Sequence, residues 1–174
     1  MTTLALDWSY RTTEIPEAGL RENRDATAEE RAALAAELEI LSCEKLTAVF
    51  SIRATGKGHY RLTGELKGRV TQPCVVTLEP VSEAVEGNFD VEYWPPASMP
   101  ETGEEEMEAL SAAEIEPIEH GRIDAGRIVF ETLVASLNPY PRKPGAAFEE
   151  SESEPPSAGG TSAFEALKKL KEGR

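Results

Sequence analysis

Cysteine and long apolar runs are scarce in this chain of 174 residues. The two cysteines, Cys43 and Cys74, are too few for a disulfide scaffold, and we expect both to be free thiols. No apolar run approaches the roughly 20 residues that span a bilayer, so no membrane partner is expected. The first residues, from Met1 to Trp8, contain neither the charged nor the apolar region of an export signal. These absences together predict a cytoplasmic protein.

Histidines and catalytic motifs are equally scarce. Neither His59 nor His120 has cysteines or carboxylates at metal-ligand spacing. No Gly-x-Ser-x-Gly elbow is present, and Gly56-Lys57-Gly58 has the setting of a hairpin turn rather than of a phosphate loop. Glutamates 104–106 lie in a stretch without regular elements, which favours a solvated loop over an acid/base site. We therefore expect no enzymatic activity, no cofactor and no small-molecule substrate; an enzyme with a site assembled from distant residues is the second alternative.

Lysine and arginine are absent from one long stretch. None lies between Arg69 and Arg122, in a chain whose net charge is −14. The acidic residues of this stretch are Glu79, Glu83, Glu86, Asp90, Glu92, Glu101, Glu104, Glu105, Glu106, Glu108, Glu114, Glu116 and Glu119. Residues 53–69 have the opposite balance, with Arg53, Lys57, Arg61, Lys67 and Arg69 against Glu65 alone. This sorting predicts two surfaces suited to oppositely charged partners.

The basic residues fall in the second half of a predicted β-hairpin. Every second residue from Leu46 to Ile52 is apolar, the turn follows at residues 56–58, and the return strand runs to Val70. In the return strand Tyr60, Leu62, Leu66 and Val70 share one face, and His59, Arg61, Thr63, Glu65, Lys67 and Arg69 share the other. Gly64 and Gly68 interrupt the strand and predict a bulge or a bend.

Local signals predict the remaining elements. A capping box, Thr27 with Glu30, begins a helix that runs to Leu41, with Leu34, Leu38 and Leu41 on one face. Asp124 begins a second helix that runs to Leu137. The strands expected besides the hairpin are residues 4–14, 74–78 and 83–94, with a short extended segment at 115–123.

These elements predict one α+β domain over residues 1–142. Its core is a curved, mainly antiparallel sheet or a small open barrel with two packed helices, and residues 95–110 form an acidic loop. Residues 143–161 have the composition of a flexible linker. Residues 162–174 predict a short amphipathic C-terminal helix with Phe164, Leu167 and Leu170 on one side. This stripe is too short to stand alone in water, so we expect it to pack against a partner surface.

Several stretches of the chain form an ordered set of motifs. From Ile115 onward, Ile123 and Asp124 open a helix, Glu131 lies within it, and Leu137-x-Pro139 ends it. Upstream lie the strand 62–70 with its glycines and the segment 72–81 around Cys74, and downstream lie Phe164, Leu167 and Leu170. Together these stretches resemble the YceD family, the large ribosomal RNA subunit accumulation proteins, with its Gly-rich strand, cysteine segment, helix and closing motif. Many members have Cys-x-x-Cys where Cys74 is followed by Thr77, so a zinc or dithiol role is not implied here.

The resemblance implies a non-enzymatic ribosome biogenesis factor that supports the accumulation of large-subunit ribosomal RNA. From the charges we expect an RNA-binding set and a set that faces a basic large-subunit ribosomal protein. The first is Arg53, Lys57, Arg61, Lys67 and Arg69, and the second is Glu104, Glu105, Glu106 and Glu108. The alternative is a dedicated chaperone of a small basic ribosomal protein that does not contact RNA.

Overall fold

The computed structural model describes residues 6–99 and 114–147. Its contacts divide the chain into two units, Met1–Pro144 and Gly145–Arg174, and the description below concerns the first unit. The strands are β1 (Ser9–Arg11), β2 (Leu20–Asp25), β3 (Ser42–Gly56), β4 (His59–Pro73), β5 (Pro80–Trp94), β6 (Glu114–Pro117) and β7 (Arg122–Asp124). The helices are α1 (Ala28–Glu37), α3 (Ala125–Ser136) and two 3-10 turns, η1 (Thr12–Glu14) and η2 (Pro96–Ser98).

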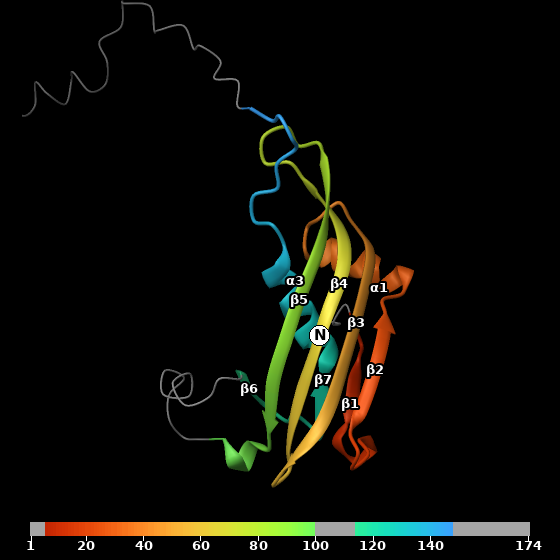
Figure 1. Ribbon diagram of the computed structural model, residues 1–174, viewed down its shortest axis with the longest axis vertical. Helices are drawn as coiled ribbons and strands as arrows, with labels where there is room; N and C mark the ends of the chain where they lie inside the picture. Colours follow the sequence, from red (N-terminus) through yellow and green to blue (C-terminus); the bar gives the residue numbers. More distant parts are fainter. Residues whose placement is uncertain (1–5, 100–113, 148–174) are drawn as a thin grey trace, which may run out of the picture. The chain divides into compact units, whose positions relative to one another are not determined.

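The main sheet has the strand order β2-β3-β4-β5-β6 (Figure 1). Its first four strands pair antiparallel, and β6 pairs parallel with the end of β5. A second sheet consists of β1 and β7. The α+β class with a mainly antiparallel sheet and two helices is confirmed. The main sheet does not close into a barrel, because β2 and β6 form its two edges.

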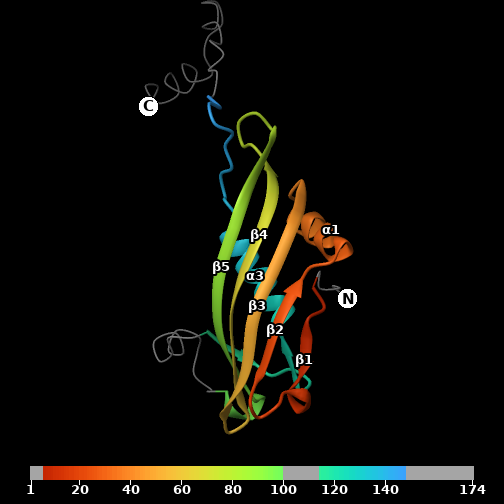
Figure 2. The ribbon, with the colours of Figure 1, turned by 45° about the vertical axis from the view of Figure 1, so that its right-hand side comes forward.

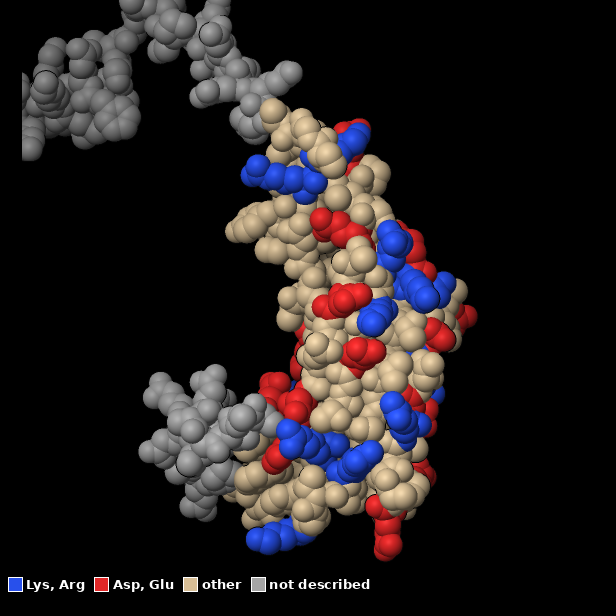
Figure 3. Space-filling view, viewed as in Figure 1, with Lys and Arg blue, Asp and Glu red and all other residues tan. Residues whose placement is uncertain are grey.

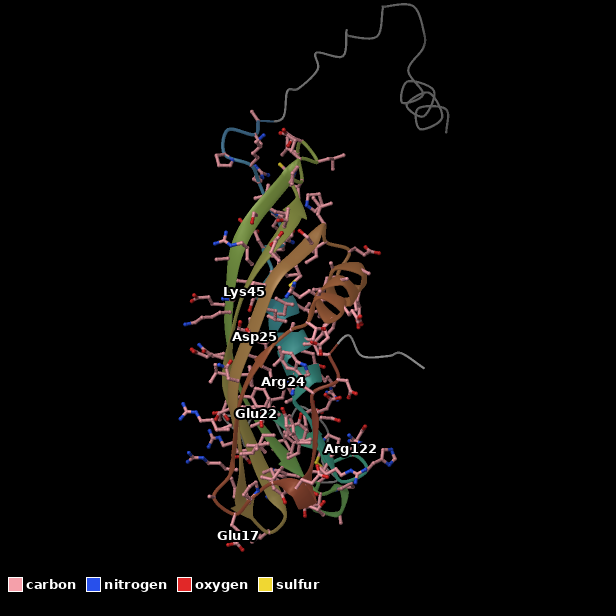
Figure 4. All side chains as sticks on the ribbon, turned by 90° about the vertical axis from the view of Figure 1, so that its right-hand side faces the viewer. Glu17, Glu22, Arg24, Asp25, Lys45 and Arg122 are labelled. Carbon is pink, nitrogen blue, oxygen red and sulfur yellow. The ribbon has the colours of Figure 1, made fainter. Side chains whose placement is uncertain are left out.

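Both helices cover the same face of the main sheet (Figures 2 and 4). The apolar residues of β3 and β4 that point toward the helices are buried, among them Phe50, Ile52 and Leu62. From α3, Ile128, Val129 and Leu133 complete this core. The opposite face of the sheet faces solvent, so alternate residues of each strand serve the core and the surface. We call this second side the open face.

The central hairpin has the register that its period of two predicts. Ile52 faces Leu62 and Ala48 faces Leu66, and the pairing continues without a shift past Gly64 and Gly68. The predicted bulge at these glycines is therefore wrong. Gly64 instead makes room for large side chains, since a Cβ there would lie 2.6 Å from both Phe50 Cβ and Phe89 Cζ. The irregularities of this pair of strands lie nearer their ends, at residues 43–45 and 54–56.

The capping box at the start of α1 is confirmed. Thr27 Oγ1 accepts a hydrogen bond from the Glu30 amide, and Glu30 Oε2 accepts one from the Thr27 amide at 2.7 Å. Glu30 Oε1 also accepts from the indole of Trp8 at 2.8 Å, which ties the helix to the buried chain before β1. The helix ends at Glu37, four residues earlier than predicted, and Leu41 is 54% exposed.

The second predicted helix is also confirmed. Asp124 is the N-cap of α3 and accepts a hydrogen bond from the Arg127 amide at 3.0 Å. Leu137 follows the last residue of the helix as its C-cap. No helix in the described part of the chain has the length and apolarity that crossing a bilayer requires.

Other predictions are corrected by the structure. Of the expected strand at 4–14, the described residues from 6 onward contain only β1 followed by η1, and β2 was not predicted. The expected strand at 74–78 is the turn between β4 and β5, and the extended segment at 115–123 divides into β6 and β7. The strand at 83–94 is confirmed as part of β5. Of the acidic loop only residues 95–99 are described, and the predicted helix at 162–174 lies outside the described residues.

Candidate nucleic-acid interface

The open face of the main sheet carries most of the basic residues that the sequence singles out. Arg53, Arg61, Lys67 and Arg69 are all exposed and all lie on this side of β3 and β4, as the alternation predicts. Lys57 lies instead in the turn between the two strands, with a positive φ of 55°. The open face also holds two basic residues that were not predicted as site residues, Arg21 on β2 and Lys45 on β3.

Five of these cations line a trough along the open face, which we call the basic trough. One hollow of about 460 Å³ is lined by Arg21, Arg53 and Glu65 among others. A second hollow is lined by Lys45, Lys67, Arg69 and the same Glu65. The two hollows share Val49 and Glu65 in their linings, so they lie next to each other across β2, β3 and β4. The basic trough thus has five positive charges, from Arg21, Lys45, Arg53, Lys67 and Arg69, against one carboxylate.

An acidic stripe lies directly beside the basic trough, on β5. It consists of Glu86, Asp90 and Glu92, which face Lys67, Thr63 and Arg61 in the register of β4 and β5. Figure 3 shows that positive and negative side chains alternate over short distances on this face. The prediction that the two charges occupy separate surfaces is therefore wrong for β5, because the acidic strand is the immediate neighbour of the basic one.

Asp90 of the acidic stripe forms an ion pair with Arg61, one of the predicted RNA-binding residues. Arg61 donates from Nε to Asp90 Oδ1 at 2.7 Å and from a terminal nitrogen to Asp90 Oδ2 at 2.6 Å. These hydrogen bonds from Arg61 hold the pKa of the Asp90 carboxyl below its usual value. Lys67 approaches Glu65 at 3.8 Å. Within the described residues Arg21, Lys45, Arg53 and Arg69 form no ion pair, so these four cations are the ones open to an anionic ligand.

The Cys74 thiol organises the turn that connects β4 and β5. Its Sγ accepts hydrogen bonds from the amides of Thr77, at 3.5 Å, and Lys143, at 3.4 Å. The side chain and amide of Thr77 and the amide of Lys143 lower the pKa of this thiol to about 6. Thr77 is therefore a hydrogen-bond partner of the sulfur. No group of three metal-ligating side chains is found in the part of the chain that the structure describes.

Asp124 and Glu131, two of the predicted motif residues, make contacts that stabilise α3. Burial raises the pKa of the Asp124 carboxyl, which caps the helix. Glu131 accepts from Arg127 Nε at 2.8 Å, and Arg127 also pairs with Glu116 of β6 at 2.8 Å. The Arg127–Glu116 pair fastens α3 to the edge of the main sheet, whereas the Arg127–Glu131 pair lies within the helix. Pro139 follows the helix and is exposed.

Two predicted sets of residues cannot be placed. The partner-facing set, Glu104, Glu105, Glu106 and Glu108, lies outside the described residues, as does the apolar stripe of Phe164, Leu167 and Leu170. Their roles stay predictions.

Residues 62–171 match the family described as large ribosomal RNA subunit accumulation protein YceD. The match covers more than half of the chain. The chain belongs to the YceD family. Neither a curated protein nor a solved structure matches it.

The YceD match and the basic trough overlap only in part. The matched residues include nearly all of β4, all of β5, β6 and β7, and α3. They therefore include Lys67, Arg69, Asp90 and Cys74, whereas Arg61 lies one residue before the match. Arg21, Lys45 and Arg53 belong to β2 and β3, which precede the YceD match. Three of the five trough cations are thus supplied by strands outside the matched region.

Proposed function

We propose that this YceD-family chain supports the accumulation of large-subunit ribosomal RNA by binding RNA at the basic trough, without catalysing a reaction. The family gives the process, and the arrangement of charges gives the binding surface. The acidic residues 104–108 then face a basic large-subunit ribosomal protein, a partner inferred from charge alone.

The observation that carries the proposal is the concentration of cations in a concave surface. A net charge of −14 opposes binding of RNA by the protein surface as a whole. Five cations around two adjacent hollows create a local positive field, because two of them line the first hollow and three line the second. Four of the five have no ion-pair partner among the described residues, so phosphates need not displace a carboxylate.

Filter binding of large-subunit ribosomal RNA fragments over a salt series tests the proposal. Each phosphate contact adds about 0.7 to 0.9 to the slope of log K against log salt. Reversing Lys45 and Arg69 together (Lys45→Glu, Arg69→Glu) should lower that slope by roughly 1.5 or more and weaken binding at every salt concentration. A matched control reverses Arg11 and Arg142, which are exposed but lie outside the trough. Binding without a salt slope, or equal loss in both double variants, would contradict RNA binding at this surface.

A second candidate function is a chaperone of a small basic ribosomal protein that does not contact RNA. The acidic stripe on β5 and the net charge favour it, since both attract a basic polypeptide. Pull-down from nuclease-treated extract separates the two functions. Recovery of one small basic protein, with unchanged recovery by the Lys45→Glu, Arg69→Glu variant and no RNA binding by the purified chain, would favour the chaperone.

A further inference from the structure

Two aromatic rings are stacked on the solvent side of the sheet, at one end of the open face. The imidazole of His59, the first residue of β4, lies over the indole of Trp94, the last residue of β5. The ring centroids are 4.6 Å apart and the planes differ by 14°. Both side chains are partly exposed, and neither belongs to the core cluster on the other face.

The orientation of the indole is fixed by a hydrogen bond. Trp94 Nε1 donates to Glu92 Oε2 at 3.0 Å, two residues earlier on the same face of β5. With the imidazole on its face and a carboxylate at its edge, the indole is held before any ligand arrives. A ring that is already ordered loses little conformational entropy when a flat ligand stacks on the pair.

The stacked pair continues the line of the basic trough. On the open face, the next position along β4 from His59 is Arg61, and Arg61 faces Arg53 on β3. Arg53 lines the first hollow, and Lys45 marks the other end of the trough, eight residues away along β3. At about 3.3 Å per residue the cationic line is roughly 27 Å long. This length suits a single strand on the order of four to eight nucleotides.

The acidic stripe determines how an RNA strand is oriented across the open face, that is, whether its phosphates or its bases lie over β5. Phosphates are attracted to β3 and β4, where trough cations lie, and repelled from β5, where Glu86 and Glu92 lie. Bases carry no net charge, and their amino groups donate hydrogen bonds to carboxylates. Trp94 belongs to β5, so the ring pair is on the side that the bases of such a strand would occupy.

We propose that the ligand of the open face is single-stranded RNA, with one base stacked on the His59–Trp94 pair and the phosphates along the basic trough. This inference rests on the proposed function and specifies its substrate. Base stacking on aromatic side chains requires an unpaired base, since the bases of an A-form duplex are already stacked on each other and their edges lie in grooves. A basic trough without a stacking platform would bind duplex and single strand by charge alone.

The test compares a labelled single-stranded RNA of about ten nucleotides with the duplex of the same sequence. Fluorescence anisotropy is measured with the full chain and with the Trp94→Ala, His59→Ala and Trp94→Phe variants. Trp94→Ala should weaken single-strand binding about 5- to 150-fold, the range for loss of one base stack, without changing the salt slope. Trp94→Phe keeps an aromatic face and should bind nearly as the unaltered chain does. Tyr140→Ala, which removes an exposed aromatic ring away from the open face, should have no effect.

Tryptophan fluorescence provides a second readout. Trp8 is 1% exposed and Trp94 is on the open face, so quenching by RNA should come from Trp94 and be lost in Trp94→Phe. Salt-dependent binding that Trp94→Ala leaves intact, or equal affinity for duplex and single strand, would overturn this inference and leave the proposed function standing. Absence of salt-dependent binding by the unaltered chain would overturn the proposed function and this inference with it.

Discussion

Arg61 and Asp90 form a two-bond ion pair across β4 and β5, with nitrogen to oxygen distances of 2.7 and 2.6 Å. The pair is diagonal, because Asp90 faces Thr63 in the register and Arg61 faces Glu92. Planar guanidinium and carboxylate groups suit this geometry. Arg61 is thus neutralised within the sheet, although it has the same strand and face as Lys67 and Arg69. Cations that the alternation places on the same strand and face therefore differ in whether their charge is free to bind an anionic ligand.

We expect Arg69→Ala and the double variant Arg61→Ala, Asp90→Ala to differ in RNA binding. Arg69 has no ion-pair partner among the described residues, so its loss should lower the salt slope by about 0.7 to 1. The Arg61 guanidinium is already paired with Asp90, so removing both residues should leave affinity and slope unchanged. Salt titrations of the two variants measure this difference. The pair is exposed to solvent, so it should contribute little to the free energy of unfolding. An equal slope loss in Arg69→Ala and in the double variant would contradict the prediction.

Gly64→Ala should destabilise the fold by about 1 to 3 kcal/mol. The added Cβ would lie 2.6 Å from Phe50 Cβ, Phe89 Cζ and the Val49 carbonyl oxygen, and the first and last of these atoms cannot move without moving the backbone of β3. Gly87→Ala is the matched control, because its Cβ would meet only the ends of Thr132 and Ser136 at that distance. Urea denaturation followed by circular dichroism measures both. A Gly87→Ala loss as large as that of Gly64→Ala would show that the rigid contacts are not what limits this site.

The Cys74 thiol should make the free energy of unfolding depend on pH. Hydrogen bonds from Thr77 and Lys143 lower its pKa in the folded chain to about 6, against an ordinary value of 9.0. A lowered pKa means that the thiolate stabilises the folded state fully above pH 9.0 and that this contribution is lost as the pH falls through about 6. The serine of Cys74→Ser does not titrate in this range. The difference in free energy of unfolding between the unaltered chain and this variant should therefore grow as the pH rises from about 6 to 9.0.

Urea unfolding at several pH values measures this gap, and thiolate absorbance near 240 nm follows the ionisation directly. Burial raises the pKa of the second thiol, Cys43, so the folded chain should show one early and one late transition. The early transition should persist in Cys43→Ala and vanish in Cys74→Ser. A gap that stays constant with pH would exclude a stabilised thiolate.

The sequence pattern was sufficient where a single local rule governs the structure. Alternation over Leu46–Ile52 and Leu62–Val70 predicts the hairpin, its register and the face that carries the basic residues. Thr27 with Glu30 and Asp124 predict both helix starts, because capping is a local hydrogen-bond requirement.

Prediction failed where distant segments decide the outcome. Residues 20–25 are mostly polar, and their strand β2 exists because it pairs with β3 and carries Arg21 onto the open face. Residues 74–78 have strand-like composition, but they form a turn in which the Cys74 sulfur accepts hydrogen bonds from the amide of Thr77 and from the amide of the distant Lys143. The pairing of Arg61 with Asp90 depends on β5 being next to β4. Lys45 has the same parity on β3 as Arg53, so the alternation of this strand, extended back to residue 45, predicts it on the open face as well.

Because the helices cover only one face of the main sheet, neighbouring residues of a strand have different roles. On β4, Leu66 belongs to the packing against the helices, whereas Lys67 beside it belongs to the solvent side. Chemistry on the uncovered side can therefore be altered step by step, at odd-numbered positions of that strand, while the even-numbered positions keep the protein folded. A series of affinity variants at the solvent-facing positions should therefore share nearly the same thermal midpoint, because none of them changes the packing against the helices.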